Sequence, residues 1–351
     1  MNLKKKIFYW SPFLVPIATP KAVVNSAIAM QKFGKDYDCS IINFFGEFNS
    51  FKSDLDNNNV KLIHYFGRRS LSFFPKYGKL KSRFSFMVIF ILSFFPLKKL
   101  ILTKKPDFLI IHLITSLPLI LLILFRFKTK FILRISGLPK LNLFRKFLWK
   151  LALKKIYMVT CPTISTAEYI KSLNLLPEEK IRVLFDPIIN IKKTNLKKRE
   201  IINLPFSKDK YFFAAGRLTK QKNFIFLCNV VKNIIISEPN FKLVIAGDGE
   251  DKNEILSFIK KYHLEKNIFL IGYVDNIFPY ILSSEAFILS SLWEDPGFVL
   301  VEAGYCRVPV ISSNCPQGPK EIIKDGINGI LFNSNDVKDF LKCFKKLKDI
   351  I

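Results

Sequence analysis

The feature that most constrains this chain is a regular alternation of short apolar runs with segments of helical periodicity. The runs that predict strands lie at residues 6–10, 39–45, 60–65, 107–112, 131–135, 158–161 and 181–185, and then at 211–215, 242–246, 268–271, 286–290, 309–313 and 329–332. Helical patterns lie between many of them, as at 20–33, 141–155 and 165–173. Because parallel neighbours in a sheet need crossover helices, this alternation predicts an α/β protein with parallel sheets.

The 351 residues are enough for two such sheets, each with a core of its own. A polar, lysine-rich stretch separates the two halves and shows little periodicity. We therefore predict two doubly wound, Rossmann-like domains that face a deep cleft, because ligands of such domains bind beyond the carboxyl ends of the strands. The predicted division is a first domain at 1–190, a linker at 191–204, a second domain at 205–335 and a terminal helix at 336–351.

The charge balance favours an anionic partner. Lys and Arg number 55 and Asp and Glu 28, which gives a net charge of +27. Nucleic acid, an anionic membrane surface and phosphorylated substrates all fit such an excess, and so does a simple bias toward Lys, Ile, Asn and Phe. The six cysteines are scattered without a C-x-x-C pair. Together with a first segment that lacks the pattern of a signal peptide, they predict a cytoplasmic location.

Two apolar runs, 84–96 and 117–125, are shorter than the roughly 20 residues that span a bilayer. For the second run we expect a buried helix. For the first run a buried helix and a helix on a membrane surface remain equal alternatives. The second alternative rests on the basic residues of segment 76–105, which suit peripheral docking at the inner face of a membrane. They are Lys76, Lys79, Lys81, Arg83, Lys98, Lys99, Lys104 and Lys105.

Three polar segments follow predicted strands of the second half. In 216–223, Arg217 and Lys222 leave the end of a strand together and suit a diphosphate, although a solvated basic turn looks the same. In 294–303, Pro296 and Gly297 form a turn, and the backbone N–H groups of the helix expected from Phe298 would make a phosphate site.

Two acids flank that helix start, and the third segment follows the next strand. Glu294 on the loop and Glu302 on the helix suit sugar hydroxyls, although acids are also common at a helix start. In 312–321, Gly318 would allow the backbone to approach a ligand closely. The same residues also suit a stiff turn between a strand and a helix. The Gly-x-Gly at 247–249 is too short for a dinucleotide fingerprint.

Taken in order, Arg217 with Lys222, the turn 247–249 and the spacing Glu294-x7-Glu302 resemble the donor domain of glycosyltransferase family 4, over about residues 205–335. The resemblance implies a GT-B fold and transfer with retention of anomeric configuration. It also implies that Arg217 and Lys222 bind the donor diphosphate, while Glu294 holds the transferred sugar and Glu302 the ribose. The loop 315–319 is similar to that of members that use UDP-N-acetylhexosamines.

In the first half the resemblance is looser. His112 ends a strand where similar enzymes place an active-site histidine, although a lone histidine here also suits a hydrogen-bonded core. Arg134, Ser136 and Gly137 follow the next strand. The loop after the first strand lacks the glycines of the family. The predicted catalytic residues are Arg217, Lys222, Glu294 and His112, and the predicted donor-binding residues are Gly216, Tyr273, Val274, Gly297, Phe298, Val299, Leu300, Glu302, Ala18 and Thr19.

Neither a metal nor a cofactor is expected, because the resemblance assigns the leaving-group charge to basic residues and a helix N-terminus. Asp54-Leu55-Asp56 matches a metal-binding D-x-D, but it lies in a polar run and we expect a loop. The predicted function is transfer of a hexose or N-acetylhexosamine from a nucleotide sugar to a glycan or lipid-linked acceptor. Two alternatives stay open: a sugar-nucleotide epimerase of the same fold, and a nucleic-acid-binding protein. Because the Phe residues fall inside apolar segments, we expect no nucleic-acid partner.

Overall fold

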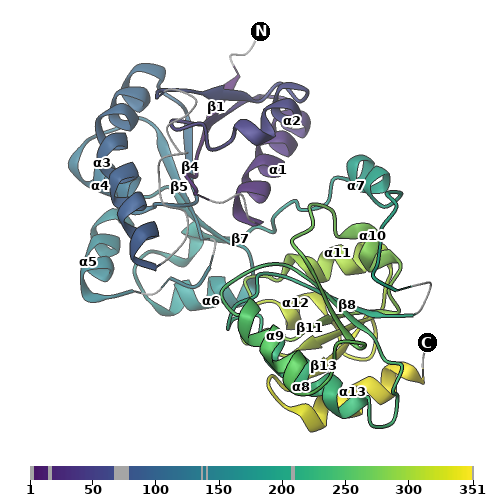
Figure 1. The fold of residues 1–351 in the computed structure, drawn as a ribbon. Coiled ribbons are helices and arrows are strands. Elements are labelled where there is room, and N and C mark those ends of the chain that lie inside the picture. Colours follow the sequence, from purple (N-terminus) through teal and green to yellow (C-terminus); the bar gives the residue numbers. More distant parts are fainter. Residues whose placement is uncertain are drawn as a thin grey trace. The chain divides into compact units, whose positions relative to one another are not determined.

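A computed structural model describes residues 4–14, 18–66, 79–135, 137–139, 141–206 and 210–349, without the side chains of 18 and 79–82. The chain divides into two compact units, Met1–Ile188 and Ile189–Ile351. Each unit is a parallel sheet with helices on both faces (Figure 1). The predicted class, two Rossmann-like α/β domains, is therefore confirmed.

The first unit is built on seven parallel strands. They are β1 (Lys5–Trp10), β2 (Tyr37–Ile42), β3 (Lys61–Ile63), β4 (Phe108–Ile111), β5 (Lys130–Arg134), β6 (Met158–Cys161) and β7 (Ile181–Val183). Their order in the sheet is β3-β2-β1-β4-β5-β6-β7. The chain runs outward from β1 in one direction and, after β4, in the other, so the topological switch point lies between β1 and β4.

Helices cover both faces of this sheet, with one apolar core on each face. One face carries α1 (Ala18–Phe33) and α2 (Lys52–Asp56), whose Val23, Ala27 and Leu55 pack against β1 and β2. The other face carries α3 (Lys79–Lys104), α4 (Ser116–Leu124), α5 (Leu143–Ala152) and α6 (Ile164–Ser172). The described part of this unit also contains two 3-10 turns, η1 (Asn49–Phe51) and η3 (Glu178–Lys180).

The second unit repeats the plan with six parallel strands. They are β8 (Phe212–Ala215), β9 (Leu243–Ala246), β10 (Ile268–Gly272), β11 (Ala286–Leu289), β12 (Val310–Ser313) and β13 (Ile330–Phe332), in the order β10-β9-β8-β11-β12-β13. The switch point therefore lies between β8 and β11. The helices are α7 (Ile191–Lys197), α8 (Phe224–Ile234), α9 (Lys252–Lys261), α10 (Phe278–Leu282), α11 (Phe298–Cys306), α12 (Pro319–Ile322) and α13 (Val337–Lys348).

Every predicted strand is present, with ends that differ by at most a few residues. The boundaries between domains differ more. The segment expected as a linker contains α7, which belongs to the second unit: Lys198 donates to the Tyr305 carbonyl, and Asn276 to the Lys197 carbonyl. Helix α13 packs Phe340 and Phe344 into the core of the same unit. The prediction of a loop at 54–56 is wrong, because both aspartates lie in α2, where the fully buried Leu55 anchors the helix.

Helix α3 is much longer than the apolar run 84–96 suggested. The residues from Arg83 to Lys104 form one helical segment that is long and apolar enough to cross a membrane, and a third of its most apolar part is buried. The prediction that this segment is too short to span a bilayer is therefore wrong. Lysines did not end the helix, because Lys98 lies over the ring of Phe125 and the apolar pattern continues through Ile101. Helix α4 is buried as expected.

Candidate functional site

The predicted donor residues of the second unit gather at its switch point. Lys222 lies on the loop after β8, and Glu294 on the loop after β11, the neighbouring strand. Their side chains form an ion pair that is largely shielded from water, with exposed fractions of 15% for Lys222 and 6% for Glu294. Two residues that are 72 positions apart thus meet where a doubly wound sheet binds its ligand.

Serines fix the geometry of this ion pair. Ser291 Oγ donates to Glu294 Oε1 at 2.5 Å, and Ser313 Oγ donates to the Ser291 carbonyl at 2.6 Å. On the other side, Ser290 Oγ donates to the Lys222 carbonyl at 2.8 Å. All three serines are buried. We did not predict Ser290 and Ser291 as site residues, although their position directly after a buried strand was the signal that marks them.

A helix N-terminus lies directly after Glu294. Gly297 has φ of +89°, the left-handed region that favours glycine, and from it α11 begins at Phe298. The first N–H groups of a helix have no partner within the helix, and they favour an anion. Phe298 and Val299 contribute such groups here, while the Leu300 N–H already donates to the Gly297 carbonyl at 3.0 Å. Glu302 follows one turn later on α11 and is half-buried.

The loop after β12 closes against this helix start. A Cβ atom on Gly318 would lie 2.0 Å from the Pro296 carbonyl oxygen, so only glycine allows this approach. The Glu294 N–H also donates to the Pro316 carbonyl at 3.2 Å. Burial is the main cause that raises the pKa of Cys315 to about 11. The thiol is therefore protonated at neutral pH and is no nucleophile.

The glycine turn at 247–249 serves loop packing. A Cβ atom on Gly247 would lie 1.9 Å from the Gly216 carbonyl oxygen, and one on Gly249 would lie 2.3 Å from the Leu218 carbonyl oxygen. The Gly216 N–H donates to the Ala246 carbonyl, and the Leu218 N–H to the Asp248 carbonyl, both at 3.0 Å. The turn thus holds the loop that carries Arg217 and Lys222.

The remaining donor residues lie along the same edge of the second sheet. Arg217 is exposed beside Gly216. The cation that pairs with Glu294 is Lys222 and not Arg217. Tyr273 and Val274 follow β10, two strands away from β8 in the sheet. Tyr273 is 66% exposed, so its ring is available to a planar ligand.

In the first unit the predicted histidine also lies at the switch point. His112 follows β4, and its N–H donates to the Trp10 carbonyl at 2.9 Å. The side chain is buried. Burial first, and then the charge of Arg134, lower the pKa of His112 to about 3. The ring is neutral at physiological pH, so one nitrogen can donate a hydrogen bond while the other accepts one.

Arg134 is held in place from the segment after β7. Its Nη1 donates to the Leu184 carbonyl at 2.6 Å, and its Nη2 pairs with Asp186 at 2.8 Å. Of the other predictions in this unit, Thr19 lies in the first turn of α1, and Gly137 is half-buried. Ser136 and the side chain of Ala18 lie outside the described residues. His64 is 3.5 Å from the Asn43 amide, and in the second unit His263 follows the C-cap residue of α9, Tyr262.

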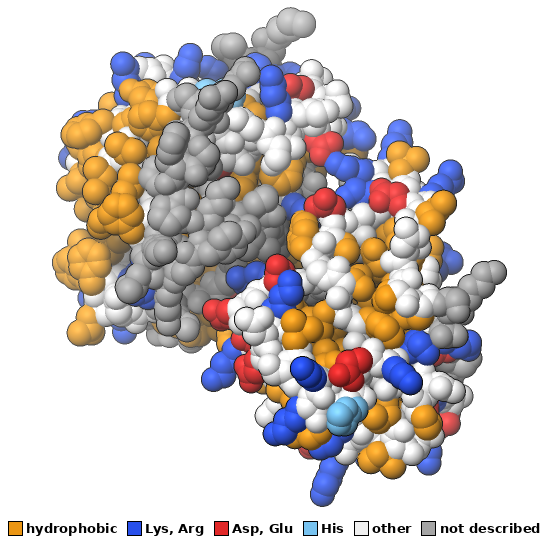
Figure 2. Space-filling view, in the orientation of Figure 1, with side chains coloured by type: hydrophobic (Ala, Val, Ile, Leu, Met, Phe, Trp, Pro, Cys, Tyr) orange, Lys and Arg blue, Asp and Glu red, His pale blue; other side chains and the backbone are white. Residues whose placement is uncertain are grey.

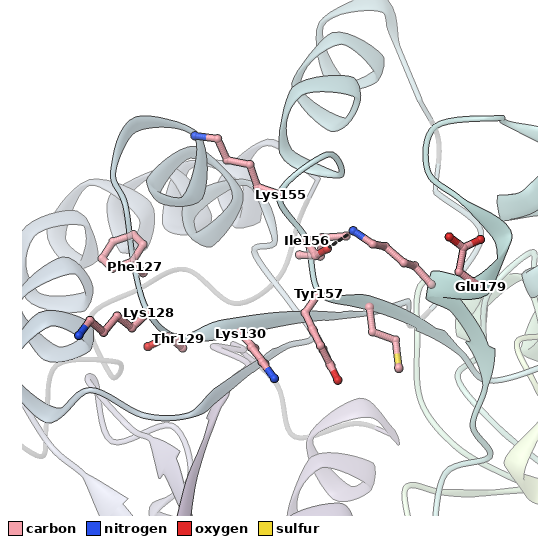
Figure 3. A pocket seen from close by; sticks show the side chains of 10 residues that line it. Phe127, Lys128, Thr129, Lys130, Lys155, Ile156, Tyr157 and Glu179 are labelled. Atoms are coloured by element: carbon pink, nitrogen blue, oxygen red, sulfur yellow. Dashed lines mark hydrogen bonds between the residues drawn. The ribbon is translucent and has the colours of Figure 1, made fainter.

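A cavity of about 540 Å³ lies at the opposite edge of the first sheet, at the amino ends of β5 and β6 (Figure 3). Three of the lysines that line it have partners: Lys155 donates to the Leu122 and Ile123 carbonyls, Lys180 donates to the Ile156 carbonyl, and Lys130 lies over the Tyr157 ring. None of the predicted site residues lines this cavity. Across the described part of the chain, His, Cys, Asp and Glu side chains form no group of three that could hold a metal ion.

Comparisons with known proteins find glycosyltransferases. Residues 197–349 match the family model of glycosyl transferases group 1. An uncharacterized glycosyltransferase of Methanocaldococcus jannaschii is 29% identical over 85% of this chain and 74% of its own length. A Campylobacter jejuni N-acetylgalactosamine-N,N'-diacetylbacillosaminyl-diphospho-undecaprenol 4-alpha-N-acetylgalactosaminyltransferase is 29% identical over 57% of this chain and 54% of its own length. An Escherichia coli UDP-Gal:alpha-D-GlcNAc-diphosphoundecaprenol alpha-1,3-galactosyltransferase is 31% identical over 47% and 42%.

Solved structures share the fold over nearly the whole chain. Anabaena HepE, in complex with UDP and glucose, aligns over 99% of this chain and 90% of its own, with a TM-score of 0.68 and 14% identity. TarM aligns over 99% and 93%, with a TM-score of 0.73 and 14% identity. At such low identity these likenesses concern the fold alone. With the match at 197–349 and the glycosyltransferase relatives, the chain is a glycosyltransferase enzyme of two Rossmann-like α/β domains, as in the GT-B fold, and its second half matches glycosyl transferases group 1.

Proposed function

We propose that this enzyme is a retaining glycosyltransferase of family 4. It transfers a hexose or N-acetylhexosamine from a UDP-sugar to a glycan or polyprenyl-linked acceptor, in the synthesis of a surface polysaccharide or glycoconjugate. The observation that carries the proposal is the buried Lys222–Glu294 ion pair beside the N-terminus of α11, at the switch point of the second sheet. A cation, a carboxylate and a helix start are what a diphosphate linked to a sugar requires.

In the donor complex, Lys222 exchanges part of its contact with Glu294 for the diphosphate. The exposed Arg217 reaches the same phosphates from the start of its loop. Glu294, held by Ser291, is then free to accept hydrogen bonds from the hydroxyls of the transferred sugar. Glu302 takes the ribose hydroxyls, and Tyr273 and Val274 take the base.

Transfer breaks the bond between the anomeric carbon and the phosphate oxygen, and forms a bond from that carbon to the acceptor oxygen on the same face. The departing phosphate oxygen takes the acceptor proton, so no enzyme base is needed. Arg217, Lys222 and the N–H groups of α11 stabilise the negative charge on the leaving group, usually the largest catalytic contribution. Neutral His112 hydrogen-bonds the donor sugar without repelling these cations, and no metal or cofactor takes part.

The names of related proteins support the choice of donor and acceptor. HepE was solved with UDP and glucose, and the Escherichia coli relative is named for a UDP-Gal donor. The Campylobacter jejuni and Escherichia coli relatives are both named for acceptors on diphospho-undecaprenol. We therefore place this enzyme in the cytoplasm, peripherally bound to the inner face of the membrane through segment 76–105.

The described part of this segment, in α3, supports such binding. Within α3, Ile89, Leu97 and Ile101 are buried in the core of the first unit, so this face of the helix lies on the sheet. The opposite face exposes Phe84, Ile91 and Phe95 by 55%, 60% and 73%. These two faces support a helix that lies in a membrane interface rather than across a bilayer.

The test of the transfer reaction is the substitution Arg217→Ala, with Lys220→Ala as its matched control. Lys220 is an exposed cation on the same loop. Loss of Arg217 removes charge stabilisation from the leaving group and lowers kcat by about 10²-fold or more, while Lys220→Ala stays near the parent rate. Equal rates for both variants would remove Arg217 from the mechanism. An anomeric NMR spectrum of the first product then tests retention, since an inverted product contradicts it.

A further inference from the structure

A second exposed apolar row lies on α5, outside segment 76–105. Leu143, Phe147 and Leu151 recur every four residues and are exposed by 89%, 63% and 37%, and Phe144 beside them is exposed by 71%. The inner face of the same helix is already covered, because Leu148, Trp149 and Ala152 are buried. The exposed row is therefore a second face, which the fold of this unit leaves in water.

A row of cations runs beside these apolar residues with the same spacing. Lys146 and Lys150 lie on α5 and Lys154 in the turn that follows, and all three are exposed. Residues four apart lie on one side of a helix. Among the described residues, none of the three pairs with a carboxylate. Adjacent apolar and cationic rows are the pattern of a helix that lies in an anionic membrane interface.

The row on α5 lies on the same side of the first unit as the exposed face of α3. Helix α4 packs against both α3 and α5, so the three helices form one layer over one face of the sheet. Apolar side chains gather along this side of the first unit (Figure 2). Lys98 and Lys99 on α3 add to the basic residues of this layer.

We propose that α5 is a second membrane-contacting helix, which forms with α3 one docking surface for an anionic phospholipid bilayer. The apolar row enters the boundary between headgroups and acyl chains, and Lys146, Lys150 and Lys154 contact the lipid phosphates. A second copy of this chain is a poor occupant, because it brings like-charged lysine rows together. The proposal rests on the proposed function only for the membrane as the site of action.

Two membrane-contacting helices fix the orientation of the first unit on the bilayer, which one helix cannot do. A single helix in the interface leaves the unit free to roll about the helix axis. Contact through α3 and α5 together holds the first sheet in one orientation toward the bilayer. The membrane-bound acceptor then meets the enzyme in a constant geometry, which is the advantage of positioning for a transfer reaction.

The first test is a fluorescent label on α5. All six cysteines of the chain are buried, so Leu143→Cys provides one exposed thiol for an environment-sensitive dye. The dye emission shifts to the blue when vesicles that contain phosphatidylglycerol are added to the full-length protein. The same dye at Ile327→Cys, an 81% exposed position in the second unit, is the control and shows no shift. An unshifted dye at position 143, on protein that sediments with the vesicles, overturns the proposal.

The second test is charge reversal. Lys146→Glu/Lys150→Glu weakens partition onto these vesicles by about tenfold or more. Its matched control is Lys338→Glu/Lys342→Glu on α13, two exposed lysines with the same spacing, which partitions as the parent does. Phe144→Ser/Phe147→Ser is expected to weaken partition similarly, with Ile236→Ser/Ile327→Ser as its control. Partition of the lysine variant within twofold of its control refutes the role of α5.

Donor hydrolysis without vesicles separates this proposal from the proposed function. If α5 docks and the enzyme is a UDP-sugar transferase, the lysine variant hydrolyses the donor at the parent rate and loses only vesicle binding. If the parent binds vesicles through α5 but neither binds nor cleaves any nucleotide sugar, docking stands and the proposed function fails. If hydrolysis persists and the α5 variants bind vesicles normally, the function stands and the docking proposal fails.

Discussion

Glu47 is a buried carboxyl group that the proposed transfer does not use. It lies on the loop after β2, with 6% of its surface exposed, and it accepts a hydrogen bond from the Phe45 N–H at 2.9 Å. Burial raises its pKa from 4.5 to about 7. Between these two values the folded protein binds a proton that the unfolded chain releases, so the stability it contributes declines as the pH rises.

The substitution Glu47→Gln tests this directly. Glutamine keeps an acceptor for the Phe45 N–H but carries no charge at any pH. From pH 4.5 to pH 8 we expect the free energy of unfolding of the variant to rise relative to the parent by on the order of 3 kcal/mol. Denaturant unfolding at several pH values measures the difference. Glu265→Gln, at an exposed position, is the control, and a Glu47→Gln difference as flat with pH as the control contradicts the account.

His112 changes the stability with pH in the opposite direction to Glu47. Its folded pKa, about 3, lies below the ordinary 6.5, so its contribution to stability is present above pH 6.5 and is lost as the pH falls toward 3. Because parent and Glu47→Gln variant both contain His112, its effect cancels when their free energies of unfolding are subtracted.

The Lys222–Glu294 pair has a structural effect that can be separated from its catalytic one. Lys222→Met leaves the Glu294 carboxylate buried without its cation, and we expect a loss of about 3 kcal/mol in stability. In Lys222→Met/Glu294→Gln the charge is gone, and most of this stability returns. Transfer activity stays lost in both. Unfolding curves and donor turnover of the single and double variants make the test, and additive losses of stability would show that the pair is not coupled.

At the scale of single residues, the sequence pointed to Lys222 and Glu294 as site residues but did not show which side chains contact each other. Lys222 and Glu294 were predicted as separate donor ligands, because each follows a predicted strand. Their ion pair depends on β8 and β11 being neighbours, which the order of strands along the chain does not reveal. Ser291 and Ser313 were missed as supports because serine after a strand is common, and only the packed loops show what their hydroxyl groups bond.

At the scale of elements, the turn 247–249 holds the loop that carries the donor cations. Gly247→Ala places a Cβ atom against the Gly216 carbonyl oxygen, a backbone atom that cannot turn away. We expect a loss of about 1–3 kcal/mol in stability and weaker nucleotide binding, because the 216–223 loop must move. Thermal unfolding with and without UDP measures both effects.

Gly304→Ala is the matched control for this substitution. Gly304 lies within α11, where an added Cβ meets nothing within 4 Å. Alanine there is expected to stabilise the protein by about 0.5–1 kcal/mol and to leave UDP binding unchanged. A Gly247→Ala protein as stable as the Gly304→Ala protein would contradict the packing role of the turn.

The elements also show where sequence patterns mislead. Apolar periodicity located every strand, because parallel strands buried on both faces read as continuous apolar runs. It misjudged the length of α3, because lysines after an apolar run look like the end of a helix. In the structure the Lys98 cation lies over the Phe125 ring, and the helix continues. Polar composition likewise concealed α2 and α7, which are short helices held by contacts to the rest of their units.

At the scale of the whole molecule, each unit has its own apolar cores. Those of the second unit come from its own helices and strands alone. We therefore expect residues 189–351, expressed alone, to unfold cooperatively and to bind UDP. Circular dichroism on heating and calorimetric titration with UDP test this. A fragment without a cooperative transition would show that the units depend on each other, and a folded fragment without UDP affinity would place the donor site elsewhere.

The two-domain plan was predictable from the length of the chain and from its alternation of strand and helix patterns. The sequence did not reveal that segment 191–204 belongs to the second unit. The stretch 191–204 looks like a linker because eight of its residues are Lys, Arg, Glu or Asn, in a short helix and in the segment that follows it. What ties it to the second unit is Lys198 on the carbonyl and ring of Tyr305, more than 100 positions away. Such a contact leaves no local trace in the sequence.

The central claim is that the Lys222–Glu294 site binds and cleaves a nucleotide-diphosphate sugar. Release of nucleoside diphosphate from a panel of UDP-, GDP- and ADP-sugars, by the parent and by Glu294→Gln, tests it most directly. We expect the parent to cleave a UDP-hexose or UDP-N-acetylhexosamine, and Glu294→Gln to be slower by about 10²-fold while it remains folded. A parent that neither binds nor cleaves any member of the panel, or a variant as fast as the parent, would contradict it.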